Sequence, residues 1–410
     1  MALAEPPVAV SRPVVVHVYD FLHPHTGGPP QVIIHLAKAQ LDQGYHIRLI
    51  SIDADDPEVI AFVVERLGAE VELIRLHPKW IRPALSKKLI DAQLSDASAV
   101  HLHSIWPTPN LFFSYRCTQL GIPYLLSIHG HLRAEALAIK SLKKRIGLLL
   151  GYRAMLYNAT AIHALNQSEQ EEVRRFGLDA PCFILPNGIS SEEFKEAPQR
   201  SVLTRVCPEL GEAPYLLFLS RIHPPKGARD LATAFTRLYS LFPDLHLVVA
   251  GTNDGGVEEV IQVMEAAGVR DKLHLPGFLE GEEKAAAFRY AEAFCLPSYH
   301  EGFSVAVLES LAWGTATVIS TGCHFPEVAN EGVGWVHPVG ADALYDTLCE
   351  VLSDPVKREE RAQRGHDWVH THFSWYQIER GFHKIYQVLA QPAPSSTQTL
   401  PINELPDDMD

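Results

Sequence analysis

Short apolar runs of six to eight residues alternate with longer amphipathic segments along most of the chain. Runs of this length, rich in β-branched residues, predict strands, and the segments between them predict helices. Strands that are apolar throughout are typical of parallel sheets covered by helices on both faces. We predict strands at 14–19, 46–52, 69–76, 99–105, 123–129, 161–166, 182–187, 215–222, 246–251, 272–278, 293–298 and 315–320.

The predicted elements form two groups, so we expect two doubly wound α/β domains, each a Rossmann-like parallel sheet, facing a cleft. The chain has 410 residues, 47% of them hydrophobic, which is enough for two cores. A polar, proline-containing stretch at 195–214 is interpreted as the linker. The expected parts are a disordered N-terminus (1–12), a first domain (13–200), a second domain (201–370), a C-terminal helix packing back on the first domain (371–390) and a disordered tail (391–410).

The composition of the chain argues against several classes of function. The formal net charge of −14 argues against nucleic acid as a partner. Six scattered cysteines without a CxxC pair indicate reduced thiols rather than disulfides or a zinc knuckle. No apolar run approaches 18 residues, and the N-terminus lacks the features of a signal peptide. We therefore expect a cytoplasmic enzyme that does not span a membrane.

Ligands of such sheets bind beyond the carboxyl ends of the strands, so the turns after the strands are the places to search. After strand 14–19, Gly27 and Gly28 precede Pro29-Pro30 and a helix. This turn would suit an anion at a helix N-terminus, although a plain loop-to-helix turn explains it equally well. After strand 215–222, Arg221 and Lys226 stand before another helix, a pattern that suits a diphosphate or ordinary surface charge.

The stretch "SYHEGFSVAVLESLAWG" at 298–314 places Glu301 and Glu309 eight residues apart around an apolar helix. The backbone N–H groups of Phe303, Ser304 and Val305 at its start could bind phosphate. A carboxylate beside phosphates makes sense as an acceptor for neutral hydroxyls, and a ribose diol would partner Glu309. From the residues alone, a helix-capping Glu301 and a solvent-facing Glu309 explain the pattern equally well.

The Glu-x7-Glu pattern resembles the donor-site signature of retaining GT-B glycosyltransferases of family 4. The segments "LSRIHPPKG", "VVAG", "HLPGFL", "GCHFPEVA" and "LPNGI" are similar to that family in the same order along the chain. The resemblance covers most of residues 13–390 and is strongest in the second half. One departure is Ser304, where the family often has glycine, and this affects how donor hydroxyls would fit.

The resemblance implies a role for each matching residue. Arg221 and Lys226 would bind the donor diphosphate, and Glu301 would hold sugar hydroxyls. Glu309 would bind ribose, and Phe278 lies where the family's backbone pairs with the base. His129, in "LLSIHGHL", matches the active-site histidine of the first domain, with His103 as the next candidate. The remaining donor-binding positions are Gly27, Gly28, Phe303, Ser304 and Val305.

The implied reaction is retaining hexosyl transfer from a nucleotide-diphosphate sugar to a saccharide or lipid-linked saccharide, in exopolysaccharide or related glycan synthesis. We expect a UDP-hexose first and GDP-mannose second, without a metal or other cofactor. The segment 133–156 carries Lys143, Lys144 and Arg145 among leucines, with Glu135 as its only acid. It predicts either a core helix with a basic face or a patch that binds acceptors at an anionic membrane, making the enzyme peripheral on the inner face.

Two other enzyme classes are alternatives. A sugar-nucleotide epimerase of the same architecture would bind the same donor without an acceptor. The pairs "HPH" (23–25), "HLH" (101–103) and "HGH" (129–131), or Asp53 and Asp55, could instead hold a metal in a hydrolase or a metal-dependent glycosyltransferase. There is no GxGxxG after the first strand and no P-loop, which argues against a dehydrogenase or an ATPase.

Overall fold

The computed structural model describes residues 12–24, 28–76, 83–133, 137 and 141–389, which form two compact units. The first unit comprises residues up to Leu185 together with those from Ile378 onward, and the second runs from Pro186 to Gln377. The predicted disordered ends lie outside the described residues, apart from Arg12. All six cysteines are free. No helix in the described part of the chain combines the length and apolar character needed to cross a bilayer.

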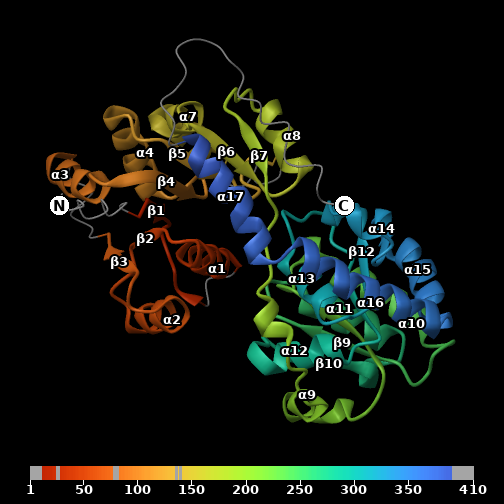
Figure 1. Ribbon diagram of the computed structural model, residues 1–410. Helices are drawn as coiled ribbons and strands as arrows, with labels where there is room; N and C mark the ends of the chain where they lie inside the picture. Colours follow the sequence, from red (N-terminus) through yellow and green to blue (C-terminus); the bar gives the residue numbers. More distant parts are fainter. Residues whose placement is uncertain (1–11, 25–27, 77–82, 134–136, 138–140, 390–410) are drawn as a thin grey trace, which may run out of the picture. The chain divides into compact units, whose positions relative to one another are not determined.

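The N-terminal unit is built on a seven-stranded parallel sheet in the order β3-β2-β1-β4-β5-β6-β7 (Figure 1). Its strands are β1 (Val14–Val18), β2 (His46–Ser51), β3 (Glu72–Arg75), β4 (Ala97–His103), β5 (Tyr124–Ser127), β6 (Ala161–Ala164) and β7 (Cys182–Ile184). Its helical segments are α1 (Gly28–Asp42), α2 (Pro57–Leu67), α3 (Pro83–Leu94), α4 (Thr108–Leu120), α6 (Ser141–Gly147), the π-helical turn η3 (Leu148–Tyr152), α7 (Arg153–Tyr157) and α8 (Gln167–Arg175).

The C-terminal unit has a six-stranded parallel sheet in the order β10-β9-β8-β11-β12-β13. Its strands are β8 (Tyr215–Leu219), β9 (His246–Ala250), β10 (Leu273–Gly277), β11 (Ala293–Leu296), β12 (Thr317–Ser320) and β13 (Trp335–His337). Its helical segments are η4 (Ser191–Phe194), α9 (Arg200–Val206), η5 (Pro208–Leu210), η6 (Pro224–Lys226), α10 (Ala228–Leu238), α11 (Val257–Ala266), η7 (Arg270–Lys272), α12 (Gly281–Arg289), α13 (Val305–Ala312), η8 (Thr321–Cys323), α14 (Glu327–Asn330), α15 (Ala341–Ser353) and α16 (Pro355–His372).

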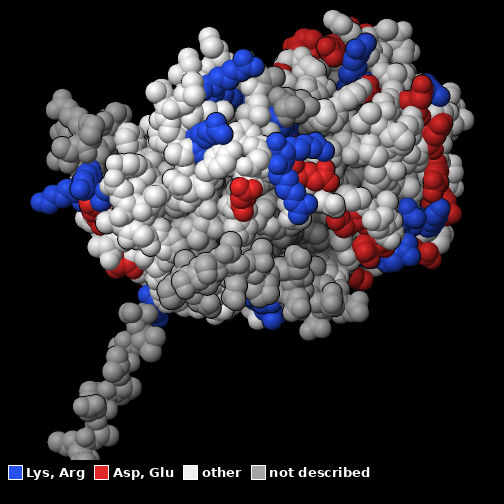
Figure 2. All heavy atoms as spheres, turned by 90° about the horizontal axis from the view of Figure 1, so that it is seen from above, with Lys and Arg blue, Asp and Glu red and all other residues white. Residues whose placement is uncertain are grey.

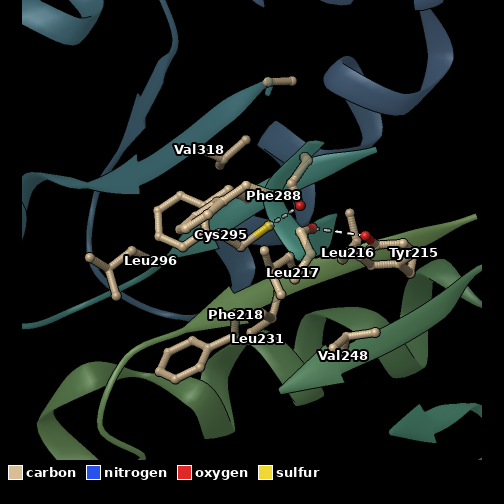
Figure 3. Packing of buried hydrophobic residues seen from close by; sticks show 14 of the residues in the cluster. Tyr215, Leu216, Leu217, Phe218, Leu231, Val248, Phe288, Cys295, Leu296 and Val318 are labelled. Carbon is tan, nitrogen blue, oxygen red and sulfur yellow. Dashed lines mark hydrogen bonds between the residues drawn. The ribbon is translucent and has the colours of Figure 1, made fainter. Parts of the chain in front are cut away.

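Apolar residues on both faces of the second sheet form its core, as the continuous apolar strands predict. Figure 3 shows Phe218 of β8 and Val248 of β9 packed with Leu231 of α10, while Phe288 of α12 lies beside Cys295 of β11. Polar groups within this core are hydrogen-bonded: the Tyr215 hydroxyl, for example, donates to the Ala287 carbonyl at 2.8 Å. A core satisfied in this way fixes the strands whose carboxyl ends carry the candidate site.

All twelve predicted strands are present, and both sheets are parallel, which confirms the predicted fold class. The predicted linker at 195–214 is wrong, because α9 lies inside it and buries Val202 and Leu203 in the core of the C-terminal unit. Its apolar side chains recur at helical spacing, a pattern that the surrounding polar residues obscured. The chain therefore passes between the units at 185/186 rather than near 200.

The helix predicted at 371–390 is α17 (Trp375–Leu389), whose residues from Ile378 onward belong to the N-terminal unit (Figure 1). Its aromatic side chains pack on the sheet, with the ring of Phe382 4.9 Å from that of His163 on β6. The Tyr386 hydroxyl is 2.8 Å from His101 on β4. This segment, more than 180 residues beyond β7, is thus part of the N-terminal core.

Candidate functional site

Two loops at the carboxyl edge of the second sheet form one surface. Gly227, which follows η6, has φ +77°, and a Cβ there would lie 2.2 Å from the Pro297 carbonyl oxygen. Only glycine can take this backbone conformation at such a close approach. The backbone N–H of Tyr299 and the hydroxyl of Ser298 both donate to the Pro225 carbonyl, at 2.9 and 3.2 Å. The sequence "PPKG" therefore holds the loop after β8 against the loop after β11.

This contact brings two predicted site residues together as an ion pair. The Lys226 ammonium donates to both carboxylate oxygens of Glu301 at 2.7 Å, and the two side chains are only 17% and 8% exposed. The sequence predicted separate tasks for them, diphosphate binding for Lys226 and sugar binding for Glu301. The pairing shows that Lys226 also offsets the cost of burying the Glu301 charge, so the two act as one unit.

Helix α13 begins at Val305, one residue after the predicted start near Ser304. Ser304 is the N-cap residue, but its side chain makes no capping hydrogen bond. The first-turn amides of Val305 and Ala306 therefore have no helical acceptor and suit an anion. The sequence interpretation omitted Ala306, because placing the helix start one residue early shifts the set of free amides. The ring of Phe303 anchors the turn, with its centroid 5.2 Å from that of Phe325.

Glu309 lies on α13 and is 16% exposed, so it is neither solvent-facing nor isolated. The Lys284 ammonium of α12 donates to its Oε1 at 2.6 Å. The negative charge of Glu309 raises the pKa of Lys284 despite the burial of Lys284, so its ammonium group stays charged. Lys284 was not predicted, and nothing in the linear sequence indicates that α12 and α13 are neighbours. Glu309 Oε2 accepts no hydrogen bond from the described residues, so it can accept one from a ligand hydroxyl.

The remaining predicted residues of this unit lie at the same edge. Arg221 follows β8 and forms an exposed ion pair with Asp254 at 3.0 Å, which a competing phosphate could break at little cost. Phe278 follows Gly277 at the end of β10, and 57% of its surface is exposed. Because all strands run parallel, β8, β10 and β11 end at one edge of the sheet. The edge thus presents amides, two cations, two carboxylates and an aromatic ring.

His129, the predicted catalytic residue, follows β5 in the N-terminal unit. Its φ of +45° is a strained backbone conformation for a residue with a side chain, and such strain is found at functional sites. Its Nε2 is buried without a hydrogen-bond partner. Burial lowers its pKa to about 3, so the ring is neutral at physiological pH. A neutral imidazole with an unused nitrogen can donate or accept one hydrogen bond from a substrate.

The other predicted residues of this unit are less informative. Gly28 begins α1, and a Cβ there would meet no atom within 4 Å, so close packing does not require this glycine. Gly27 lies outside the described residues. Lys143, Lys144 and Arg145 lie on α6, and Lys144 sits over the ring of Trp106 at 5.3 Å from the centroid.

A group of buried histidines lies around the carboxyl end of β4. Their hydrogen bonds determine which nitrogen of each ring carries the proton. His163 Nε2 must donate to the Leu185 carbonyl at 2.7 Å, so its Nδ1 accepts from the Ser127 hydroxyl at 2.7 Å. Ser127 Oγ then accepts from His101 Nε2 at 2.6 Å. His101 Nδ1 is left to accept from the Tyr386 hydroxyl of α17 at 2.8 Å.

The series of hydrogen bonds continues from Tyr386 with the same donor-to-acceptor direction. Its oxygen accepts from the Gln40 amide at 3.1 Å, and Gln40 Oε1 accepts from His17 Nε2 at 2.8 Å. His17 Nδ1 therefore accepts from His103 Nε2 at 2.9 Å. His103 Nδ1 ends the chain as a buried lone pair without a partner. Burial lowers the pKa of each of these histidines, so all are neutral.

This network bears on the metal-site alternative. His17, His101 and His103 place one ring nitrogen each within 4.8 Å of one another, as a metal site requires. Both nitrogens of His17 and of His101 are already hydrogen-bonded, so an ion could bind only after two of these bonds broke. Of the other predicted ligands, Asp53 accepts from the backbone of Leu22 and His23.

Asp55 pairs with Arg75, and His25 lies outside the described residues. Asp53, Asp55 and His101 therefore have structural partners of their own, whereas His129 Nε2 has none. Among the described residues, neither aspartate belongs to the group of ring nitrogens formed by His17, His101 and His103.

Glu379, on α17, supplies a pH-dependence prediction. Its side chain is fully buried, and neither carboxylate oxygen has a partner among the described residues. Burial raises its pKa from 4.5 to about 7, so the folded state binds the proton more tightly than the unfolded state. Stability from this group is complete at low pH and is lost as the pH rises from about 4.5 through 7.

We expect Glu379→Gln to raise the melting temperature by several degrees at pH 8 and to change it little at pH 5. The upper limit at high pH is about 3 kcal/mol of unfolding free energy. Thermal melts of both proteins across this range measure the effect. An equal shift at both pH values would contradict a protonated carboxyl at this position.

Comparison with known proteins finds a matching family model for each half of the chain. Residues 205–368 match the family model "Glycosyl transferases group 1", and residues 27–188 match "Glycosyl transferase 4-like domain". The chain is 26% identical over 377 residues to the phosphatidyl-myo-inositol mannosyltransferase of Mycobacterium leprae, covering 89% of this chain and 94% of that protein. It is 27% identical over 232 residues to a GDP-mannose-dependent monoacylated α-(1-6)-phosphatidylinositol monomannoside mannosyltransferase of Corynebacterium glutamicum, covering 53% and 60% of the two chains.

Among solved structures, Anabaena Alr3699/HepE in complex with UDP and glucose superposes with a TM-score of 0.75 at 16% identity. The match covers 92% of this chain and all of that one (100%), and with the two parallel sheets it identifies the GT-B fold. The predicted family resemblance is thereby confirmed. This chain belongs to the group 1 glycosyltransferases with a family 4-like N-terminal domain.

Proposed function

We propose that this glycosyltransferase moves a hexosyl unit, with retention of configuration, from a nucleotide-diphosphate sugar to a hydroxyl of a saccharide or lipid-linked acceptor. The observation that carries the proposal is the convergence of the α13 amides, the Lys226–Glu301 pair and the Lys284–Glu309 pair at one sheet edge. Amides and ammonium groups suit the diphosphate, and carboxylates suit the hydroxyls of sugar and ribose.

The transfer step follows from this arrangement. As the bond to the sugar breaks, negative charge grows on the leaving diphosphate, and the amides of Val305 and Ala306 with the nearby cations stabilise it. Glu301 orients the sugar by accepting from its hydroxyls. In the N-terminal unit, His129 offers a neutral ring nitrogen for a hydrogen bond to the reacting sugar. These assignments rest on the family pattern and the chemistry of each residue.

The donor is a UDP-hexose or GDP-mannose. The HepE complex contains UDP, while two curated relatives are named mannosyltransferases and one of them GDP-mannose-dependent. The names of these relatives favour GDP-mannose as the donor, whereas the sequence alone favoured a UDP-hexose. A thermal-shift screen of UDP, GDP and their sugars decides, because a ligand that binds only the folded state raises the melting temperature. No shift with any nucleotide at millimolar concentration would contradict the proposal.

We expect transfer to continue in the presence of EDTA. Two cations and a helix N-terminus already supply positive charge beside the leaving group, so a divalent ion is redundant. Initial rates with and without EDTA should agree within about twofold, since no step depends on a metal. Loss of turnover that manganese or zinc restores would contradict this and revive the histidine or Asp-x-Asp sites.

The acceptor is proposed to reach the enzyme at a membrane surface. On α6 and η3, Leu142 and Leu149 are 71% and 84% exposed beside Lys143 and Arg145. The side of the N-terminal unit seen in Figure 2 shows separate blue groups on a broad, mostly uncharged surface. Exposed leucines among cations are typical of proteins that bind anionic bilayers, and each cation adds about 1 kcal/mol.

Changing Lys143, Lys144 and Arg145 together to Ser should therefore weaken sedimentation with anionic vesicles at least tenfold, in a salt-sensitive way. Sedimentation with neutral vesicles is the control for the electrostatic contribution. Equal recovery of wild type and triple variant in the anionic pellet would leave a soluble acceptor.

A further inference from the structure

A groove runs over the outer side of the N-terminal unit, between α3, α4 and the η3–α7 segment. Its volume is about 710 Å³, within the roughly 300–1,000 Å³ typical of small-molecule sites. Helix α4 buries Phe113 and Cys117 against the sheet, which turns Leu111 and Phe112 toward the groove. The other walls include Ile90 of α3 and Met155 of α7.

Several polar side chains of the groove wall are already hydrogen-bonded within the protein and do not need water as a partner. Arg116 lies in its wall, but its guanidinium forms two hydrogen bonds to Asp91, at 2.6 and 2.9 Å, which offset its charge. The Ser114 and Thr118 hydroxyls donate to backbone carbonyls of α4. Their hydrogen-bonding capacity as donors is therefore used within the helix, and the surface left to an occupant is mainly hydrocarbon.

An irregular turn opens this groove to the exposed leucines. Gly151 lies inside the π-helical turn with φ +128°, and a Cβ there would lie 3.0 Å from Leu111 Cδ1. Beside it Leu150 lines the groove yet is 73% exposed, and Leu149 is 84% exposed. Single π-turns within helices are found at functional sites. The turn thus joins the groove to the apolar strip that the proposed membrane contact uses.

The charge around the groove selects the chemistry of its occupant. The described parts of α3, α4, α6, η3 and α7 carry seven cations and a single acid, Asp91, which is paired with Arg116. The cations are Lys87, Lys88, Arg116, Lys143, Lys144, Arg145 and Arg153. This local excess stands out in a chain with a net charge of −14. An apolar groove that is lined by Lys87 and lies on elements with this excess of cations complements an amphiphile that has one hydrocarbon chain to bury and an anionic head.

We propose that this groove takes up one acyl chain of an anionic bilayer phospholipid while the exposed leucines rest in the headgroup region. The proposal rests on the membrane contact of the proposed function and specifies how the N-terminal unit holds the bilayer. The headgroup phosphate lies beside Lys87, which lines the groove, and the chain passes Leu150 to reach Leu111, Phe112 and Met155.

The test uses phosphatidylglycerol vesicles doped with a phospholipid that carries a photoactivatable diazirine midway along one chain. After sedimentation and irradiation, mass spectrometry locates the crosslinks. We expect them on the peptides of α4 and η3–α7. Ala154 lines the groove and is exposed, so Ala154→Trp fills the groove without disturbing the core. It should reduce these crosslinks at least tenfold per pelleted protein.

Ala61→Trp is the matched control, because Ala61 is exposed on α2, outside the groove lining and the exposed leucines, and the variant should retain the crosslinks. If Ala154→Trp melts early, Leu150→Ser removes a wall of the groove at an exposed position and serves the same purpose. Unchanged crosslinking in the filled variant, crosslinks confined to other peptides, or absence of the protein from the pellet would each overturn the proposal. The nucleotide thermal shift, measured on the same proteins, reports separately on the proposed donor site.

Discussion

Replacing His129 with alanine should lower kcat at least 100-fold and leave the dissociation constant of the donor within about twofold. A positioned hydrogen-bonding or proton-transferring group contributes roughly 10²–10⁴ to a rate. His129 belongs to the N-terminal unit, whereas the proposed nucleotide contacts belong to the C-terminal unit, so binding and turnover should separate. Steady-state kinetics and isothermal titration with the nucleotide sugar measure the two quantities.

The control variant is His23→Ala, which removes a histidine ring from the loop after β1. In the sequence, this loop is far from the strained turn at His129. Because burial holds the pKa of His129 near 3, the wild-type kcat should also show no titration of this ring between pH 5 and 8. A fall of less than about tenfold, or 1.36 kcal/mol of barrier, would mean that His129 is not catalytic. His103, whose Nδ1 is also buried without a partner, is then the next candidate.

Lys226→Ala should have the second large effect, since it disrupts binding and stability together. The variant removes a cation from the diphosphate site and leaves the Glu301 carboxylate, 8% exposed, without its partner. An unpaired buried charge costs about 3–5 kcal/mol, and the same carboxylate then repels the phosphates. We expect donor affinity to fall at least 100-fold and the melting temperature to drop by several degrees.

The double variant Lys226→Ala/Glu301→Gln separates the two effects. It removes the buried charge, so most of the lost stability should return. Donor affinity should remain low, because the cation is still missing and Glu301 no longer accepts from the sugar as a carboxylate. If Lys226→Ala lowers only the melting temperature and the donor binds normally, the pair is structural.

The strand positions and the sheet type were predictable because buried parallel strands are apolar on both faces. The missed strand, β13, has only three residues and lies between glycines and a proline, whereas the equally short β7 belongs to a longer apolar run. The interpretation of 195–214 failed for a related reason, since a few buried side chains of α9 stand among many polar ones. Where local pattern is short or mixed, tertiary packing decides the element.

The candidate site was predictable as a set of positions but not as a set of partners. Family resemblance supplied Glu301, Lys226 and Glu309, yet their ion pairs depend on loops and helices that meet only in the folded chain. Lys284 has no local signal at all. The histidine network is similar, because its order follows from Gln40 on α1 and Tyr386 on α17, 346 residues apart.

The most direct test of the account is a structure determined with bound UDP or GDP. We expect the diphosphate at the N-terminus of α13, with the Val305 and Ala306 amides and Lys226 as its partners. We expect the ribose hydroxyls within hydrogen-bonding distance of Glu309 and the base beside the backbone at Phe278. A nucleotide bound at another strand edge, or a diphosphate held by a metal ion at the histidine cluster, would contradict it.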